Sequence, residues 1–374
     1  FGPKKLGFGC MRLPMSEGTV GGEGVVDTRQ VCAMVDAFLE QGFCYFDTAH
    51  GYIAQKSEPT VRQCLVERHP RDRYLLTDKL SGTFFQTEEE IRPFFESQLE
   101  ITGAGYFDFY LMHALNANQY QKFTECNAFQ VAQQLKNEGK IRHVGISFHD
   151  TPEVLEQILS EHPEIEVVQI QFNYADLEDP KVQSLAVYEV CRRHGKPVIV
   201  MEPVKGGALA NLPEAAGQIL DRLQGGSRAS YAIRFAASFE GVAMVLSGMS
   251  SLEQMQDNLS YMSSFQPLTQ PEQEAVRRAG AVLKNQEAIA CTACRYCEAG
   301  CPMRIPIPDL FAGFNGKKQG SGSTFDYETA VSDGHGRASS CIGCLQCEAV
   351  CPQHLPVSAL LAQVAGEFEA AHEA

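Results

Sequence analysis

Short apolar runs alternate with amphipathic segments through the first 260 residues of the chain. Eight of these runs are predicted to be buried strands, at residues 6–10, 43–47, 74–79, 107–113, 144–147, 167–172, 197–202 and 242–247. The apolar spacing between them predicts helices at residues 28–40, 88–101, 119–137, 152–159, 180–194 and 227–238. Strands that are apolar along their whole length and alternate with helices are typical of a parallel sheet covered on both faces.

This alternation predicts an α/β fold, a (β/α)8 TIM barrel. A doubly wound open sheet is the alternative, but no Gly-rich dinucleotide fingerprint follows the first strand. The expected domains are a barrel at residues 1–265, a linker helix at 266–290 and a smaller, mainly α-helical domain at 291–374. Within that last domain we predict helices at residues 305–314, 355–364 and 358–374, and a Gly-, Ser- and Lys-rich loop at 313–338.

Polar residues stand at the predicted C-terminal end of nearly every strand, where parallel barrels keep their active sites. These strand-end residues are Asp47, Lys79, His113, Ser147, Gln169, Glu202 and Ser247. Tyr52 follows Asp47 by five positions. Taken alone, this segment also fits an ordinary loop in which Asp47 caps the next helix. Several polar groups that arrive at one face of a barrel instead indicate a catalytic centre.

The same residues resemble the aldo-keto reductase family, in order and spacing, over residues 6–260. The resemblance rests on Asp47-Thr48-Ala49-x-x-Tyr52, Thr77-Asp78-Lys79, Asp108-Phe109-Tyr110-Leu111-Met112-His113 and Val144-Gly145-Ile146-Ser147. It implies a catalytic tetrad in which Tyr52 is the general acid that protonates a carbonyl oxygen. It further implies that Lys79 lowers the pKa of Tyr52 and that Asp47 holds the lysine. His113 would orient the substrate oxygen.

The resemblance also implies a site for a nicotinamide cofactor. Ser147 and Gln169 stand where family members hold the nicotinamide amide, but Phe148 replaces the usual Asn. After the seventh strand, the family's Tyr-Ser-Pro-Leu becomes Met-Glu-Pro-Val at residues 201–204. The cofactor-binding residues expected from this turn are Glu202, Val204, Lys205, Gly206 and Gly207. A carboxylate here opposes phosphates unless the lysine neutralises it, whereas the two glycines could present N–H groups to an anion.

The loop after the last strand completes the expected cofactor site. Its candidate residues are Ser247, Gly248, Gln254 and Asn258. NADP-preferring members of the family carry a Lys-Ser pair and a later Arg in this loop, and residues 248–254 contain no cation. A 2′-phosphate therefore has little to pair with. We expect NAD(H) or NADP(H) with a weak 2′-phosphate site, and a flavin in the same cavity is the alternative.

Eight of the 14 cysteines lie within residues 291–351, and the other six are scattered singly through the preceding part. The eight form two copies of C-x2-C-x2-C-x3-C-P, at residues 291–302 and 341–352. Bacterial-type ferredoxins carry this run, with three thiolates on one 4Fe-4S cluster and the fourth on the other cluster. Structural zinc is the alternative, but zinc sites normally use separated pairs of cysteines.

The ferredoxin resemblance implies two 4Fe-4S clusters with crossed ligation. One cluster would take Cys291, Cys294, Cys297 and Cys351, and the second Cys341, Cys344, Cys347 and Cys301. The segment 302–340 is longer than in compact two-cluster ferredoxins. Together with the helices predicted in this region, it makes the domain similar to α-helical ferredoxins.

These resemblances imply an enzyme that interconverts an aldehyde or ketone and an alcohol, with hydride transfer from a nicotinamide and Tyr52 as proton donor. A hydride carries two electrons and each cluster passes one, so three roles for the clusters stay open. They could be structural, or they could feed a flavin in a ferredoxin-coupled oxidoreductase. In the third, the chain is an electron-transfer protein whose barrel binds a ligand without turnover.

Charge narrows the range of partners. The chain has 31 basic and 46 acidic residues, a formal net charge of −15, and contains no basic run. This argues against binding to nucleic acid or to an anionic membrane. No apolar stretch has membrane-spanning length and no secretory signal pattern is present, and clusters need a reducing compartment, so we expect a cytoplasmic protein. The expected partners are a small carbonyl or alcohol substrate and an electron-transfer protein.

Overall fold

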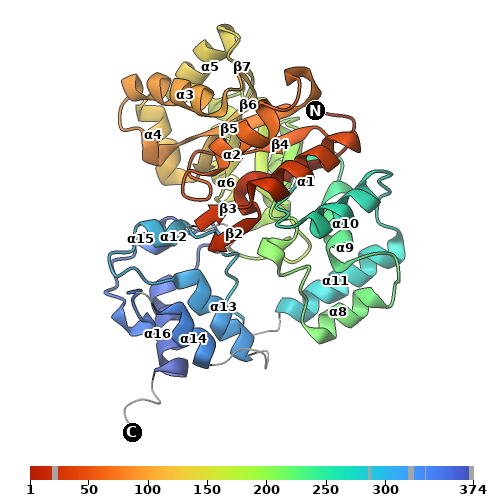
Figure 1. The fold of residues 1–374 in the computed structure, drawn as a ribbon, viewed down its shortest axis with the longest axis vertical. Coiled ribbons are helices and arrows are strands. Elements are labelled where there is room, and N and C mark those ends of the chain that lie inside the picture. The colour runs from red at the N-terminus through yellow and green to blue at the C-terminus, as the bar shows by residue number, and fades with distance from the viewer. Residues whose placement is uncertain (19–23, 285–287, 319–323, 333, 370–374) are drawn as a thin grey trace.

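The larger part of the chain is a closed barrel of eight parallel strands in a computed structural model that describes residues 1–18, 24–284, 288–318, 324–332 and 334–369 (Figure 1). The strands are β1 (Leu6–Gly9), β4 (Tyr45–Asp47), β5 (Leu75–Ser81), β6 (Phe107–Leu115), β7 (Ile141–Phe148), β8 (Val167–Gln171), β9 (Val198–Met201) and β10 (Val242–Ser247). Their order is β1-β10-β9-β8-β7-β6-β5-β4, and β1 pairs with both β10 and β4. The predicted TIM barrel is confirmed, and the open sheet is excluded.

Helices surround this barrel. They are α1 (Thr28–Glu40), α2 (Ser57–Val61), α3 (Glu88–Thr102), α4 (Ala117–Glu125), α5 (Ala128–Asn137), α6 (Pro152–Glu161), α7 (Ser184–Arg193), α8 (Glu214–Asp221), α9 (Arg228–Ala237), α10 (Leu252–Met262) and α11 (Gln270–Lys284). A two-stranded hairpin, β2 (Met15–Gly18) with β3 (Gly24–Val26), precedes α1. The apolar pattern did not predict this hairpin, α2, α8 or α10.

Two helix predictions need correction, and both corrections have a backbone cause. The single helix predicted at 119–137 is two helices, because Asn127 adopts a left-handed φ of 51° and breaks the segment. The helix predicted from residue 180 begins at Ser184, since Gln183 before it has a φ of 47°. Asn tolerates this conformation better than most residues, and Gln has no such preference, so only the first break carries a sequence signal.

Aromatic and aliphatic side chains fill the barrel interior. One buried cluster draws on five of the strands and comprises Tyr45, Phe109, Leu111, Val167, Ile199, Met244 and Leu246. These residues form a packed layer, so the barrel has no open channel at this level. The polar strand-end residues lie beyond this layer, at the C-terminal ends of the strands.

The C-terminal part is mainly helical, as predicted. Its helices are α12 (Tyr296–Ala299), α13 (Ile307–Lys318), α14 (Thr324–Ala330), α15 (Gln346–Ala349) and α16 (Val357–Phe368). The loop predicted at 313–338 is wrong for residues 313–318 and 324–330, which lie in α13 and α14, and residues 319–323 and 333 lie outside the described part. The predicted terminal helix ends at Phe368, and residues 370–374 lie outside the described part. In the described chain no helix has the length and apolar character needed to cross a membrane.

The two cysteine runs have the same local backbone. The short helices α12 and α15 each follow a residue with left-handed φ, at Arg295 (63°) and Leu345 (60°). A separate apolar core that includes Leu310, Phe311 and Leu361 holds the helices of this part together. We call the segment from residue 288 to residue 369 the cysteine module.

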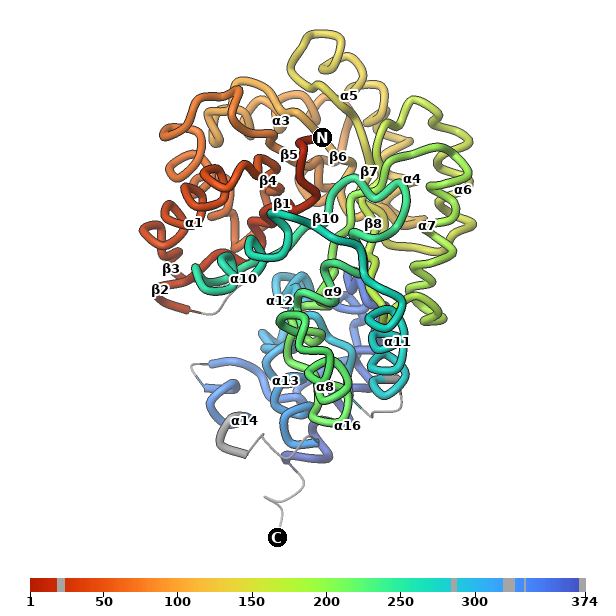
Figure 2. Tube along the Cα trace, turned by 90° about the vertical axis from the view of Figure 1, so that its right-hand side faces the viewer, coloured from red at the N-terminus to blue at the C-terminus, as the bar shows by residue number. Residues whose placement is uncertain are grey.

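The cysteine module packs against the end of the barrel where the strands terminate (Figures 1 and 2). The helix α12 lies nearest to the barrel in both views. Gln353 of the module and Gln171 at the end of β8 are both buried, and each donates an amide hydrogen to the other, at 2.8 and 3.1 Å. Because these contacts lie at the strand ends, the module covers the face on which barrels of this class carry their sites.

Candidate functional site

The four residues predicted as a catalytic tetrad meet at the ends of neighbouring strands. Asp47 ends β4, Lys79 lies in β5 and His113 lies in β6. The fully buried Lys79 ammonium donates to the Asp47 carboxylate at 2.6 Å and to the carbonyl oxygen of Thr48 at 2.8 Å. It also lies 3.1 Å from the hydroxyl of Tyr52. The ammonium therefore has three oxygen partners, and one of them is the predicted proton donor.

A strained loop presents Tyr52 to the strand ends. The three residues after it, Ile53, Ala54 and Gln55, have left-handed φ values of 53°, 47° and 68°. Such a conformation costs L-residues about 1 kcal/mol each. The hydroxyl of Ser57 holds the loop, since it bonds to the Thr48 hydroxyl at 2.8 Å and to the carbonyl oxygen of Cys10 at 3.0 Å. Backbone strain that the surroundings enforce is common at functional sites.

We expected Lys79 to lower the pKa of Tyr52, and the structure contradicts this expectation. Burial raises the pKa of the Tyr52 hydroxyl well above its ordinary value, and the charge of Asp47 raises it further. The reason is that Tyr52 is only 8% exposed, so the cost of burying a phenolate outweighs its stabilisation by the Lys79 ammonium. Tyr52 therefore keeps its proton at neutral pH, which is the state that a general acid needs.

His113 faces the tyrosine, with 5.8 Å between the centroids of its ring and the Tyr52 ring. Burial lowers the pKa of His113 well below its ordinary value, and Lys79 and His149 lower it further. Its Nδ1 lies 2.6 Å from the Ser81 hydroxyl. If Nδ1 of the neutral ring accepts from Ser81, the proton resides on Nε2. Ser81 was not singled out from the sequence, although residues two apart on a strand share a face.

A second group of buried polar residues lies behind the tetrad. Glu58 and Asp78 are fully buried, and the Gln98 amide donates to a carboxylate oxygen of each at 3.0 Å. Burial, and next the charge of Glu58, raise the pKa of Asp78 well above its ordinary value. The Asp78 carboxyl therefore holds its proton more readily than a solvent-exposed aspartate does. Gln98 also donates to the carbonyl oxygen of Lys79 at 3.1 Å, so this group fixes the strand that carries the lysine.

The residues expected to hold the nicotinamide ring lie side by side. Ser147 and Gln169 are partners across β7 and β8, and both are buried. Among the described residues, Oε1 of Gln169 has no hydrogen-bond partner, so it is free to accept from an amide N–H. Phe148, which stands where the family has Asn, is 2% exposed and belongs to the apolar core. This end of the expected cofactor site can hold a small planar amide.

The residues expected to meet the cofactor phosphates bind one another instead. The Glu202 carboxylate accepts from the backbone N–H of Gly206 at 2.5 Å and lies 3.8 Å from the guanidinium of Arg12. Burial raises the pKa of Glu202, and Arg12 opposes the rise. Lys205 pairs with the buried carboxylate of Asp176. The cation and the N–H group that could have received a phosphate are therefore already bonded.

The cysteine module fills the space beside this turn. A Cβ on Gly206 would lie 2.6 Å from the carbonyl oxygen of Thr292 and 2.7 Å from its Cα. Val204 and Gly207 belong to the same turn, which closes with a bond of 3.0 Å from the Gly207 N–H to the Val204 carbonyl oxygen. The diphosphate of a dinucleotide does not fit here in this arrangement, because backbone already occupies the place.

The remaining expected cofactor residues lie together after β10. The Ser247 hydroxyl donates to Oδ1 of Asn258 at 3.1 Å. Gln254 accepts a backbone N–H of its own turn at 2.8 Å. A Cβ on Gly248 would lie 3.1 Å from Cδ of Arg12. These four residues lie together at one side of the site. The polar side chains among them form hydrogen bonds with one another or with the nearby backbone.

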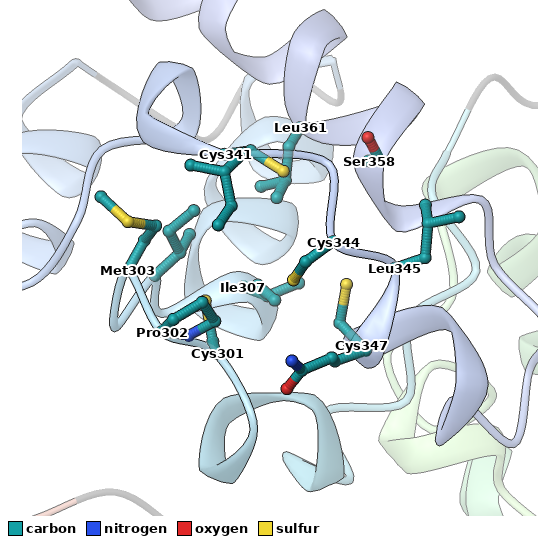
Figure 3. Close-up of a pocket in the computed structure, with 13 residues that line it drawn as sticks. Cys301, Pro302, Met303, Ile307, Cys341, Cys344, Leu345, Cys347, Ser358 and Leu361 are labelled. Atoms are coloured by element: carbon teal, nitrogen blue, oxygen red, sulfur yellow. The ribbon is translucent and has the colours of Figure 1, made fainter.

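Four cysteines from the two runs line one pocket of the cysteine module. They are Cys301, Cys341, Cys344 and Cys347. Figure 3 shows all four side chains around the same space. The last cysteine of the first run thus lies with the triplet of the second run. We call this group the outer cysteines, because Cys344 is exposed, and so are Met303, Ile342 and Leu345, which line the same pocket.

The other four cysteines, which we call the inner cysteines, lie nearer to the barrel, since the charges of the barrel residues Arg12 and Glu202 act on the pKa values of Cys291 and Cys294 respectively. They are Cys291, Cys294, Cys297 and Cys351. Burial raises the pKa of Cys291 to about 11 and that of Cys294 to about 12, and Cys351 lies close enough to raise both further. In the described chain no three His, Cys, Asp or Glu side chains are placed to hold a single metal ion. Ligands of a cube stand farther apart than ligands of one zinc ion, so both groups suit clusters better than zinc.

Solved structures with the same fold come from aldo-keto reductases. An aldo-keto reductase from Klebsiella pneumoniae in complex with NADPH is 21% identical, with a TM-score of 0.58 over 73% of this chain and 90% of that chain. The holo form of an aldo-keto reductase from Bacillus halodurans is 24% identical, with a TM-score of 0.59 over 74% of this chain and 91% of that chain. At these identities the likeness shows the barrel fold.

Family models account for both parts of the chain. The model of the 4Fe-4S dicluster domain matches residues 290–355. None of the curated proteins matches the chain. The model of the Aldo/keto reductase family matches residues 5–281, which is more than half of the chain. The chain therefore belongs to the aldo/keto reductase family of oxidoreductases.

Proposed function

We propose that the chain is an oxidoreductase that interconverts an aldehyde or ketone and the corresponding alcohol, with Tyr52 as the proton donor. One observation carries this proposal: the buried Lys79 ammonium lies 2.6 Å from Asp47 and 3.1 Å from the Tyr52 hydroxyl at the strand ends. An ammonium in this position stabilises the phenolate that remains after Tyr52 has given its proton away.

Two side chains act on the substrate oxygen: Tyr52 donates a proton to it and His113 donates a hydrogen bond to it. As the carbonyl carbon gains a hydrogen together with an electron pair, negative charge develops on the oxygen, and Tyr52 delivers a proton there. The neutral ring of His113, held by Ser81, offers its Nε2–H to the same oxygen. In the reverse direction the phenolate of Tyr52, stabilised by Lys79, removes the hydroxyl proton of the alcohol.

These roles of Tyr52 and His113 predict that kcat for carbonyl reduction is constant over a wide range of pH. Tyr52 has to be protonated, so carbonyl reduction is lost only as the pH rises through its pKa, which burial places well above 10. His113 has to be neutral, so activity is lost only as the pH falls through a pKa well below 6.5. We expect kcat for reduction to show no titration between pH 6.5 and pH 10, measured with saturating substrate. An inflection inside this range would contradict the two protonation states.

We further propose that the inner and outer cysteines each hold one 4Fe-4S cluster. The match of residues 290–355 to a dicluster domain and the two groups of four cysteines support this. The corresponding division of the chain is a barrel at 1–265, a linker helix at 266–290 and the cluster domain at 291–374. With the outer cysteines at the surface and the inner ones against the barrel, electrons from a partner protein would enter at the outer cluster.

The electron pair has two candidate sources. Family members that carry NADPH in crystals favour a nicotinamide, and the free Oε1 of Gln169 suits its amide. The second candidate is delivery of single electrons through the clusters to a bound flavin, which would pass the electron pair and a hydrogen to the carbonyl carbon. It is favoured by the contact of Gly206 with Thr292, which leaves no room for the diphosphate. Because the dinucleotide does not fit the present arrangement, we derive no step through it.

Turnover by the anaerobically purified holoprotein tests the proposal. A panel of aldehydes and ketones is offered with NADPH, NADH or reduced methyl viologen as the donor. We expect carbonyl reduction with at least one donor. Reduction with viologen and not with NADPH would assign the electron route to the clusters, and flavin bands in the visible spectrum would reveal a flavin. No alcohol product with any donor would refute the proposed function.

A further inference from the structure

The cysteine module places a tyrosine at the catalytic centre of the barrel. Tyr296 lies between two inner cysteines, Cys294 and Cys297, at the first residue of α12. Its ring packs against the apolar core of the barrel rather than that of the module. Its hydroxyl lies close enough to Tyr52 to lower the pKa of that hydroxyl, against the larger rise that burial causes. The roles proposed for the tetrad and for the cluster ligands do not involve this residue.

Contacts on both sides hold the loop that carries Tyr296. The Arg12 guanidinium, at the end of β1, donates to the carbonyl oxygen of Thr292 at 2.5 Å. Thr292 is 3% exposed and packs on Gly206, which has room for it only because glycine lacks a Cβ. At a second point of contact, the buried side-chain amides of Gln171 and Gln353 bond the module to the barrel. These contacts fix the position of the loop at 291–297 on the strand ends.

We infer that the loop at 291–297 is a wall of the reaction pocket and that Tyr296 is a positioning residue for Tyr52. The hydroxyl of Tyr296 holds the oxygen of Tyr52 in line with the substrate and stabilises the phenolate after proton transfer. This inference rests on the proposed function, in which Tyr52 is the proton donor. It adds that the barrel site is incomplete without the module.

The same loop links the iron cluster to the pocket. Cys294 and Cys297 flank Tyr296, so the ligands of the inner cluster set the backbone that carries the tyrosine. Loss of the inner cluster should therefore loosen the pocket wall, whatever the source of the electrons. The chemistry at Tyr52 then depends on a filled cluster even if that cluster passes no electron.

A conservative variant tests the role of the Tyr296 hydroxyl. Tyr296→Phe keeps the ring against the barrel core and removes only the hydroxyl, and with it the inferred hydrogen bond to Tyr52. One neutral hydrogen bond in a buried site corresponds to a loss of about five- to tenfold in kcat. We expect this loss in the holoprotein with KM changed less than about twofold, because substrate binding is not the step affected. An unchanged kcat, or a rise in KM alone, would overturn the inference.

The matched control for this variant is Tyr327→Phe. The hydroxyl of Tyr327 bonds to the Glu369 carboxylate and to the backbone N–H of Ala338 inside the module, away from the barrel. We expect unchanged kcat, so an equal loss in both variants would assign the effect to module stability and overturn the inference. Inactivity of the wild-type protein with every donor would instead refute the proposed function, so the two failures are distinguishable.

A second pair of variants tests the docked position of the loop without touching Tyr296. Gly206 and Gly195 have nearly the same φ, 63° and 64°, but a Cβ would strike Thr292 at the first and meet nothing within 4 Å at the second. Both Ala variants therefore carry the same backbone strain, and only Gly206→Ala displaces the loop. We measure hydrogen–deuterium exchange of residues 291–297 together with kcat.

We expect severalfold faster exchange of the loop in Gly206→Ala and a loss in kcat similar to that of Tyr296→Phe. Gly195→Ala should match the wild type in both measurements. Exchange and kcat that stay unchanged in Gly206→Ala would show that the loop does not wall the pocket, and the inference would fail. Faster exchange with unchanged kcat would equally overturn the role of Tyr296.

Discussion

Tyr52→Phe is expected to lower kcat for carbonyl reduction by a factor of about 100 to 10,000, the contribution of a positioned general acid. The variant removes the hydroxyl that lies 3.1 Å from the Lys79 ammonium. Phe keeps the ring, so the packing of the loop and the ion pair of Lys79 with Asp47 should survive. Product formation with the best donor and substrate of the panel, compared at saturating substrate, measures the effect.

Tyr174→Phe provides the control for Tyr52→Phe. Tyr174 is also a buried tyrosine of the barrel, and within the described part of the chain its hydroxyl has no hydrogen-bond partner. Removal of that hydroxyl should therefore leave kcat and stability unchanged. Near-normal turnover in Tyr52→Phe would remove Tyr52 from the role of proton donor. An equal loss in Tyr174→Phe would point to a general sensitivity of the barrel core.

The barrel was predictable from the sequence because its strands are buried on both faces. Runs such as residues 242–247 contain no polar alternation, and a run of this kind between two helices is typical of a strand in a covered parallel sheet. The breaks at Asn127 and Gln183 were not predictable to the same degree. A single residue with left-handed φ ends a helix without changing the apolar spacing that the prediction uses.

The placement of the predicted tetrad followed from the sequence because Asp47, Lys79 and His113 stand at or near the C-terminal ends of three neighbouring strands, and Tyr52 lies in the loop after the first of them. The lysine and the acid come together through the parallel register of β4 and β5, which pairs Asp47 with Thr77, two residues before Lys79. The raised pKa of Tyr52 was not predictable, because it depends on burial in the folded chain. Distance along the chain does not indicate which charges surround a side chain once the barrel has closed.

The contacts between the barrel and the cysteine module could not be predicted from the sequence either. In the sequence, Tyr296 is one of the variable residues between two cysteine ligands. Its inferred positioning role depends on the packing of its ring against the barrel core, which only the folded chain shows. The same holds for the pair of Gln171 and Gln353, which are separated by 182 positions. At the expected phosphate site, the sequence predicted a function that the structure does not support. Gly206 and Gly207 suited an anion by sequence, but here Gly206 receives the backbone of Thr292.

The second large effect follows from the proposed clusters: Cys→Ser at any one of the eight cysteines of the two runs should remove half of the iron, and the proposed crossed ligation decides which cluster is lost. Cys301 lines one pocket with Cys341, Cys344 and Cys347, although it follows the first triplet in the sequence. A cube that loses a thiolate ligand is no longer closed, so Cys301→Ser should lose the outer cluster and keep the inner one. Iron per chain and the spectrum of the reduced protein measure this.

Double variants decide between crossed and sequential ligation. With crossed ligation, Cys301→Ser combined with Cys341→Ser loses no more iron than either single variant, because both residues serve one cluster. Cys301→Ser combined with Cys294→Ser loses all of it, because the two residues serve different clusters. Sequential ligation predicts the opposite result for each pair. Cys126→Ser in the barrel, 8% exposed and distant in sequence from both runs, should keep all of the iron.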